Sequence, residues 1–213
     1  MVAPIIRKFW VATMLLASPV TSLACSGAER DFDARRDTNI GMLERADLIV
    51  LGRVDALPPI DAPVSYEIGL TPIRTLKGQA PTNLILYGTM RDGKELVKPS
   101  PTGLHGYHPS SSWGSCDRQG FAPGTLVVAA FVKHPTKGYI QLPERGVEDV
   151  EGPDDVWVRA ASLYTTIIRT NSSSRRRQAF QKESKRLLAK SGDPDAHAIA
   201  EDIADYLQKT AKQ

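Results

Sequence analysis

The sequence predicts an α+β fold in which a small β-barrel or sandwich is followed by a helical region. Five short segments rich in branched residues lie between positions 46 and 142, and most of them have no helical pattern between them. After Asp154 the apolar residues recur with helical spacing instead. The 213 residues are 41% hydrophobic and 24% charged, which suits one sizeable core and excludes disordered, collagen-like and multi-pass membrane chains.

The N-terminus has the pattern of an export signal. Arg7 and Lys8 precede an apolar run over 9–20, and small residues occupy the third and first positions before Cys25. The run has about 12 residues, well short of the ~20 that cross a bilayer as a helix. We therefore expect residues 1–24 to be a secretory signal peptide and the protein to be exported, either periplasmic or secreted. The remaining chain is nearly neutral, with 25 basic and 24 acidic residues.

Cys25 and Cys116 are the only cysteines of the chain. Exported proteins meet an oxidising compartment, so the sequence predicts a disulfide between them. That bond would close a loop of about 90 residues and stabilise the fold by roughly 4 kcal/mol. The alternative is a lipoprotein in which Cys25 is lipidated and Cys116 stays free. Lipidation usually requires Leu three positions before the cysteine, where this chain has Ser22.

The first two elements are a short helix and a strand. Thr38 is a suitable N-cap for a helix in which Ile40 and Leu43 lie about one turn apart. The helical spacing then gives way to a run of branched residues, which predicts a strand over 46–57. Gly52 inside this strand indicates a bulge or bend.

Four further strands follow, and one connection is unusually long. The apolar run in the fourth strand is nearly continuous, which predicts burial on both faces. The connection over 90–123 is rich in Gly, Pro and Ser, and connections of such length usually carry a function or lack a fixed structure. The remaining predicted strands span 64–76, 83–87, 125–132 and 139–142.

Three helices are expected after Asp154. A break at Asn171–Ser174 can cap the second, and Gly192, Asp193 and Pro194 form a stop, cap and first-turn signal for the third. We expect these helices to pack on the barrel or on each other. Their apolar stripes are Trp157, Ala161, Tyr164 and Ile168, then Phe180, Leu187 and Leu188, then Ile199, Ile203, Tyr206 and Leu207.

Several short stretches resemble one known family. They are Ala24-Cys25, the ADLIVLGRV run at 46–54, the RTLKG run at 74–78, and Cys116 followed by GTLVVAAF at 124–131. In this order they resemble the netrin-like, or tissue-inhibitor-of-metalloproteinases-like, OB-fold domains, which include bacterial exported members. The resemblance covers roughly residues 25–143. It implies a five-stranded OB-like β-barrel over 25–150 and a disulfide between the two cysteines, and the helical spacing that follows predicts a helical extension over 151–213.

The resemblance also implies a partner. In the animal inhibitors the free α-amine and carbonyl of the N-terminal cysteine chelate the catalytic zinc of a protease, and Cys25 occupies that place here. An amine nitrogen and a carbonyl oxygen can fill the open position of catalytic zinc. The implied partner is therefore an extracytoplasmic metalloprotease, with no cofactor bound by this chain itself.

The long connection contains a weaker candidate site. His105 and His108 precede Cys116 and could bind a metal, although their spacing matches neither a helical pair nor a zinc knuckle. Ser110–Ser112 and Asp117 could join them in a hydrolytic site. No nucleophile elbow, phosphate loop or dinucleotide fingerprint occurs in the chain, so we expect a protein that is not an enzyme.

A basic segment lies between residues 169 and 190, where Glu183 is the only acidic residue. Its field could attract an anionic membrane or envelope polymer, whereas a plain solvated helix face is the alternative. Export and the lack of interleaved aromatic residues argue against nucleic acid. The candidates for anionic-surface binding are Arg175, Arg176, Arg177, Lys182, Lys185 and Arg186.

These observations favour an exported, non-catalytic binding module for an extracytoplasmic protein whose identity the sequence does not give; the partner that the resemblance implies is an extracytoplasmic metalloprotease. Two alternatives stay open: attachment to an anionic envelope surface through the 169–190 segment, and a metal or hydrolytic site in the 90–123 loop.

Overall fold

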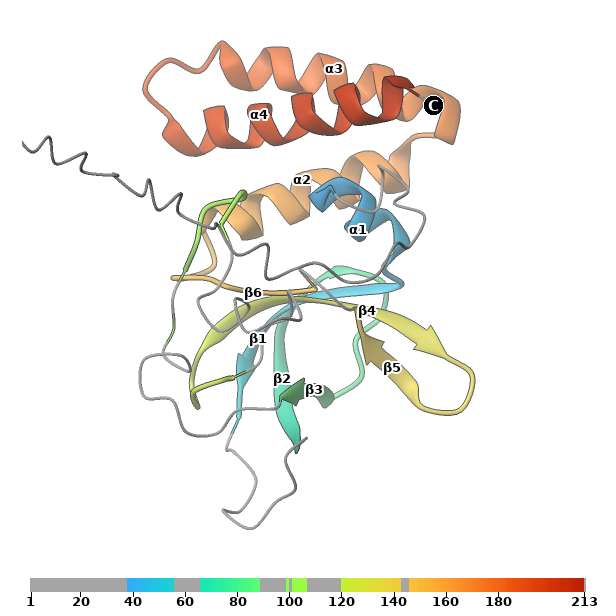
Figure 1. Cartoon of the computed structure of the whole chain (residues 1–213), viewed down its shortest axis with the longest axis vertical. Coiled ribbons are helices and arrows are strands. Elements are labelled where there is room, and N and C mark those ends of the chain that lie inside the picture. Colours follow the sequence, from blue (N-terminus) through green and yellow to red (C-terminus); the bar gives the residue numbers. More distant parts are fainter. Residues whose placement is uncertain are drawn as a thin grey trace, which may run out of the picture.

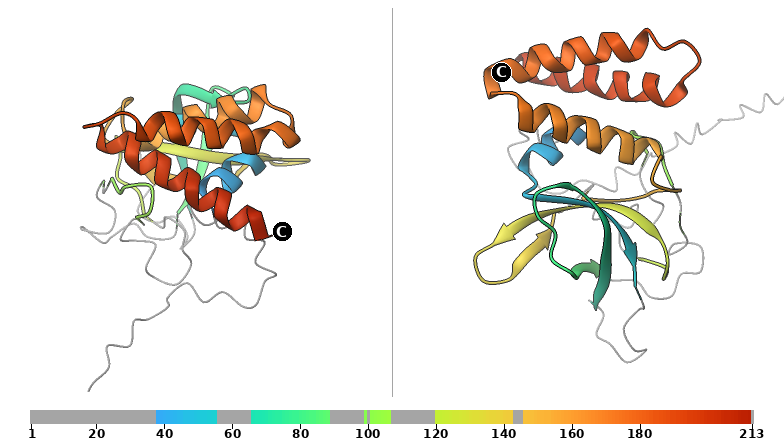
Figure 2. Two further views of the ribbon diagram at one scale, coloured as in Figure 1. Left: turned by 90° about the horizontal axis from the view of Figure 1, so that it is seen from above. Right: turned by 180° about the vertical axis from the view of Figure 1, so that it is seen from behind.

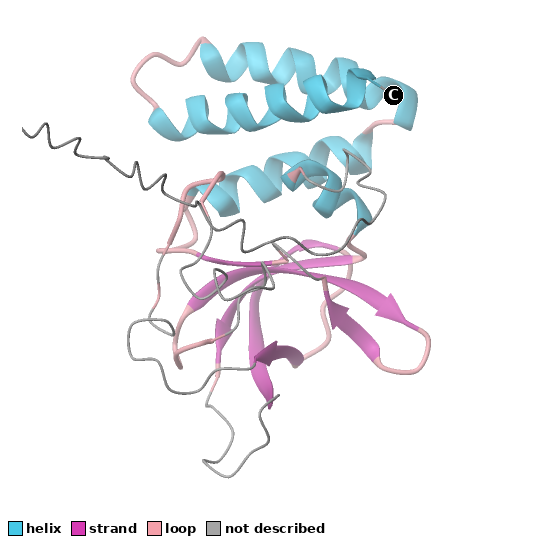
Figure 3. Cartoon of the chain, in the orientation of Figure 1, coloured by secondary structure: helices cyan, strands magenta, loops and turns pink. Residues whose placement is uncertain are grey.

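The computed structural model describes residues 38–55, 66–88, 99, 101–106, 120–142 and 146–212. A β-barrel forms the lower part of the molecule and helices form the upper part (Figure 1). Helices α1 and α2 lie directly on the barrel, and α3 and α4 form a second helical layer above them. The view from behind shows the same layering (Figure 2), and Figure 3 separates the strand part from the helical part by colour.

Within the described ranges the barrel has five antiparallel strands in the order β3-β2-β1-β4-β5. A sixth short strand, β6, pairs with β4 beyond the end of β5. The strands are β1 (Leu48–Val54), β2 (Tyr66–Lys77), β3 (Leu84–Gly88), β4 (Leu126–His134), β5 (Gly138–Gln141) and β6 (Val147–Asp149).

The barrel is nearly closed between β3 and β5. These two strands share no ladder, but the backbone N–H of Tyr87 donates to Oε1 of Gln141 at 3.1 Å. Nearby, the hydroxyl of Tyr139 donates to the carbonyl of Gln79 at 3.4 Å. A side chain thus bridges the seam where another strand pair would complete the cylinder. The predicted α+β class, a five-stranded barrel followed by helices, is confirmed.

Strands β1 and β4 are buried on both faces because each separates two cores. On β1, Leu48 and Val50 belong to the core inside the barrel, whereas Ile49 and Leu51 belong to the core between the barrel and the helices. On β4 the same alternation places Val127, Ala129 and Phe131 inside and Val128 and Ala130 outside. The continuous apolar run predicted to be buried on both faces therefore has a direct structural cause.

Gly52 lies where β1 and β2 lose their regular register. Its partner is Pro72 while the partner of Leu51 is Arg74, so one extra residue of β2, Ile73, stands between them. This is the irregularity predicted from the glycine, with the additional residue on the neighbouring strand. A Cβ on Gly52 would lie only 2.8 Å from Cδ1 of Leu70, so the residue also provides room for that core side chain.

Within the described residues, α1 and α4 begin at the caps that the sequence predicts. Thr38 Oγ1 accepts from the N–H of Gly41 at 3.0 Å, and Asp193 accepts from the N–H of Ala196 at 3.0 Å with Pro194 in the first turn. Gly192 takes φ +87°, which ends the preceding segment without strain. The helices are α1 (Asn39–Arg45), α2 (Val156–Thr170), α3 (Ser173–Leu188) and α4 (Pro194–Lys209), and a 3₁₀ turn follows at Thr210–Lys212.

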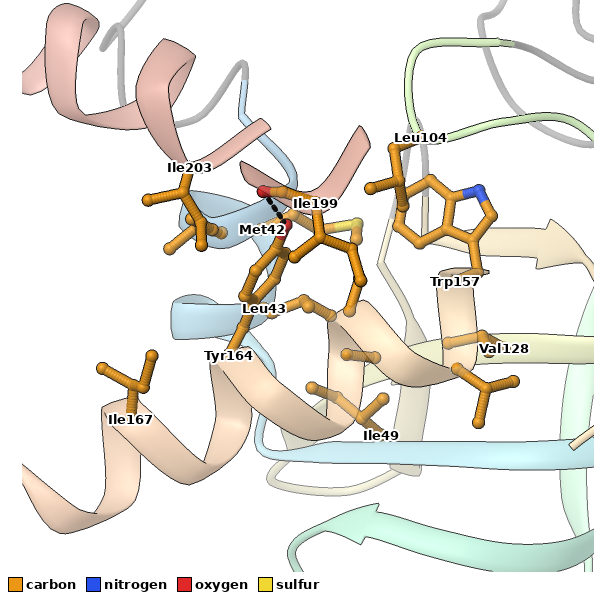
Figure 4. Close-up of a cluster of buried hydrophobic side chains, with 14 of the residues drawn as sticks. Met42, Leu43, Ile49, Leu104, Val128, Trp157, Tyr164, Ile167, Ile199 and Ile203 are labelled. Atoms are coloured by element: carbon orange, nitrogen blue, oxygen red, sulfur yellow. Dashed lines mark hydrogen bonds between the residues drawn. The ribbon is translucent and has the colours of Figure 1, made fainter. Parts of the chain in front are cut away.

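Aromatic side chains join the helical layers. Phe180 of α3 is fully buried and makes edge-on contacts with Tyr164 of α2 at 6.0 Å and with Tyr206 of α4 at 5.4 Å between ring centroids. Closer to the barrel, Trp157 lies beside Leu104 at the edge of the same cluster (Figure 4). The helices therefore pack both on the barrel and on one another.

A buried polar group ties three of these helices together. Asp202 of α4 is 3% exposed and accepts from the Tyr164 hydroxyl at 2.7 Å and from Nδ2 of Asn39, in α1, at 2.9 Å. The same Asn39 amide also donates to the carbonyl of Leu104 at 2.9 Å. Burial, with the charge of Asp202 close by, raises the pKa of Tyr164 well above its ordinary value, so the hydroxyl keeps the proton that it donates.

The structure departs from the sequence predictions in two places. Strand β6 was not predicted, because three residues are too few to show a period. Leu188, expected on the apolar stripe with Phe180 and Leu187, is instead 53% exposed. The expected signal peptide over 1–24 lies outside the described residues. None of the described helices has the length and apolar character needed to cross a membrane.

Candidate functional site

Helix α3 is held in place by its inner side. Phe180 and Leu187 are buried against α2 and α4, and the hydroxyl of Ser184 donates to the carbonyl of Ala200 at 3.3 Å. These three positions recur at intervals of three and four residues, so they define one face of the helix. The opposite face of α3 points away from both the barrel and α4 (Figure 1).

That opposite face carries a row of cations. Lys185 and Arg186 follow Lys182 by three and four residues, and Arg175 precedes it by seven, so the four side chains share one side of the helix. All four are exposed. We call this set, Arg175, Lys182, Lys185 and Arg186, the basic face of α3.

Two other candidates from the basic segment have internal partners. Arg176 is half-buried, with Nη1 at 3.4 Å from Oε1 of Glu44 and Nε donating to the carbonyl of Asn171 at 3.2 Å. Arg177 donates to the carbonyl of Leu207 at 3.0 Å and to the hydroxyl of Thr210 at 3.3 Å, at the end of α4. These two arginines fasten α3 to its neighbours, so the structure does not bring them to the basic face.

One acidic residue partly offsets the charge of the face. Glu183 forms a two-pronged ion pair with Arg186, and the hydrogen bonds from the guanidinium lower the pKa of Glu183, so its carboxyl stays ionised. Arg186 therefore presents less net charge to an approaching anion than the other members. Arg175, Lys182 and Lys185 supply most of the outward positive field.

The described part of the long connection is fixed to the helices. Leu104 is fully buried, and its carbonyl accepts from Asn39, whereas the neighbouring His105 is exposed. His108 and Cys116 lie outside the described residues, as does Cys25, so the structure does not bear on the metal site or on the disulfide. Within the described ranges no three metal-ligating side chains form a cluster.

A hollow of about 530 Å³ lies where the N-termini of α2 and α4 approach the 101–103 segment. Two of its acidic side chains, Asp155 and Asp195, have structural partners. Asp155 caps α2 by accepting from the N–H of Trp157 at 2.8 Å, and Asp195 pairs with Arg159 at 2.7 Å. Arg159 also pairs with the α4 cap Asp193 at 2.8 Å and lowers its pKa, which keeps the cap charged. Asp155, Asp193 and Asp195 therefore complement the ends of two helices.

No family model, curated protein or solved structure matches this chain. Charge alone identifies the basic segment, and the structure separates the four cations of the basic face from Arg176 and Arg177, which hydrogen-bond to neighbouring elements. The sequence itself contains the information for this division. Arg176 and Arg177 precede the apolar Phe180 by four and three residues, so helical spacing places both arginines next to the buried side of the helix.

Proposed function

We propose that this chain is an exported, non-catalytic binding module of OB-fold type that attaches to an anionic membrane or envelope polymer through the basic face of α3. The observation that carries the proposal is the arrangement of Arg175, Lys182, Lys185 and Arg186 along one solvent-facing side of a helix whose other side is buried. The strand order β3-β2-β1-β4-β5 is compatible with an OB-fold barrel.

Electrostatics favours this surface because the helix that carries its cations is already ordered. The helix is fixed by Phe180 and Leu187 before any partner arrives, so binding does not have to organise the backbone. Cations spaced along a rigid face act together on a polyanion or a charged surface, where each contributes while it lies within about 10 Å, one Debye length at 0.1 M salt. Such attachment should be strong at low salt and weak at high salt.

Neutralising Arg175, Lys182 and Lys185 together to glutamine is expected to weaken binding to dextran sulfate and to anionic vesicles by roughly 10- to 100-fold. The three side chains are exposed, so the fold should be unaffected. For the wild type, binding should be lost between about 0.1 M and about 1 M salt, because the Debye length falls from about 10 Å to about 3 Å. Binding is measured by sedimentation with each probe.

The control neutralises an equal number of exposed cations on the barrel. Arg53, Lys133 and Lys137 lie on β1, on β4 and in the turn after β4, and all three are exposed. Changing them to glutamine alters the net charge by the same amount, so it should leave binding close to that of the wild type. If both triple variants weaken binding equally, overall charge rather than the basic face of α3 determines attachment, and the proposal is wrong.

A separate proposal is that the chain binds an extracytoplasmic metalloprotease through Cys25, and it rests on the resemblance to the netrin-like inhibitors. It requires a free α-amine on Cys25 and a disulfide from Cys25 to Cys116. The intact mass of the exported protein, taken with and without reduction, is expected to correspond to a chain starting at an unmodified Cys25 that gains two hydrogens on reduction. A lipidated Cys25, another cleavage site or a free Cys116 would remove the zinc-chelating mechanism.

A further inference from the structure

The C-terminal end of α3 combines charge with an exposed apolar side chain. Leu188 is 53% exposed, and it follows Lys185 by three residues, so the two side chains are neighbours on the helix surface. Lys190, also exposed, follows in the turn toward α4. An exposed leucine gains free energy when a partner covers it with apolar groups, and the cations beside it gain from anions, so a partner that offers both is favoured.

We propose that the anionic surface met by α3 is a phospholipid bilayer, with Leu188 seated among the headgroups and the adjacent Lys185 and Lys190 on the lipid phosphates. This inference rests on the proposed function and names the partner. A soluble polyanion offers charge but no apolar layer for Leu188, whereas a bilayer surface presents both within a few ångströms. The long lysine stems can follow the leucine toward the headgroups while their ammonium groups stay hydrated.

The position of the helix sets the depth and orientation of this contact. Because Phe180 and Leu187 are committed to α2 and α4, α3 cannot turn its apolar side outward, and one leucine alone cannot insert the helix. Attachment is therefore peripheral and requires anionic lipid. Since α3 lies on the side of the helical layers remote from the barrel, docking through it leaves the barrel directed away from the bilayer (Figures 1 and 2).

The exposed apolar residues of the barrel provide a matched comparison. Ile73 is 55% exposed, close to the value for Leu188, but it lies on β2 at the register irregularity and not on α3. Replacing either residue by serine removes a similar exposed apolar side chain. Only Leu188→Ser should affect a contact made by α3.

The experiment measures binding of the exported protein to three probes: vesicles of phosphatidylcholine with phosphatidylglycerol, vesicles of phosphatidylcholine alone, and dextran sulfate. We expect Leu188→Ser to weaken binding to the anionic vesicles by about fivefold and to leave dextran sulfate binding unchanged. Ile73→Ser should change neither, and neutral vesicles should not bind the wild type.

Three results would overturn the bilayer proposal: equal binding of Leu188→Ser and wild type to anionic vesicles, equal weakening by Ile73→Ser, or wild-type binding to dextran sulfate without binding to anionic vesicles. The last result would still be consistent with attachment through the basic face. Failure of the proposed function itself is distinguishable, because the variant lacking Arg175, Lys182 and Lys185 would then bind both anionic probes as the wild type does.

Discussion

Replacing Asp202 by alanine is expected to lower the free energy of unfolding by about 2–4 kcal/mol. The carboxylate is 3% exposed and accepts from the Tyr164 hydroxyl and the Asn39 amide. Alanine would leave one N–H of the Asn39 amide without an acceptor and the Tyr164 hydroxyl with only the more distant carbonyl of Ile199 at 3.4 Å, and it would create a small void as well. A buried donor that loses its partner cannot return to water, which is why the cost exceeds that of an ordinary hydrogen bond.

The measurement is urea unfolding followed by circular dichroism, with Asp205→Ala as the matched control. Asp205 lies on the same helix, is partly exposed and pairs with Lys209 one turn later at 3.0 Å. An ion pair of this kind contributes less than about 0.5 kcal/mol, so its removal should hardly move the unfolding midpoint. Equal effects of the two variants would show that Asp202 is not the connection between α1, α2 and α4 that its hydrogen bonds indicate.

The contrast between Asp202 and the helix caps shows what sequence can and cannot predict. Gly192, Asp193 and Pro194 act on backbone groups within a few residues, so their local pattern was sufficient to place the start of α4. Asp202 acts through Asn39, 163 residues away in the chain, and nothing near it in the sequence distinguishes it from a surface aspartate. Its role depends on tertiary contacts that no local period contains.

Most strands of the barrel, like the helix caps, could be predicted from local sequence patterns. The alternation of apolar and polar residues in β2 reflects burial of one face, and the continuous apolar run in β4 reflects burial of both faces. Each pattern lies within one short segment, and each correctly predicts a strand. Strand β6 has only three residues and is fixed by its pairing with β4, so its own sequence carries too little information. The strand order arises from pairing between segments far apart in the chain, and no local pattern in the sequence predicts it.

The candidate site was predictable as a segment but not as a surface. Charge density alone identifies 169–190, yet it treats Arg175 and Arg176 alike, although one is exposed and the other pairs with Glu44. The side on which α3 is buried decides between them, and Phe180 determines that side. For Leu188 the apolar character suggested burial, whereas the packing of α3 against α4 leaves it outside.

Phe180→Ala is expected to cost about 3–5 kcal/mol of the free energy of unfolding, the range for truncating a buried phenylalanine. The ring is fully buried between Tyr164 and Tyr206, and its edge-on contacts with them add to the area that it buries. The void would lie at the only point where α2, α3 and α4 all meet through aromatic rings within the described residues. Because Phe180 also fixes which side of α3 faces outward, its loss should loosen the basic face as well.

Two measurements together test this role. Thermal or urea unfolding gives the stability loss, with Leu188→Ala as the control, since that exposed leucine should cost less than about 0.5 kcal/mol. Hydrogen exchange of α3 amides should rise in Phe180→Ala under conditions where the barrel strands remain protected, because the helix loses its main anchor before the barrel core is affected. Equal stability losses in the two variants, or exchange that rises uniformly through the barrel, would contradict the assignment of Phe180 as the residue that orients α3.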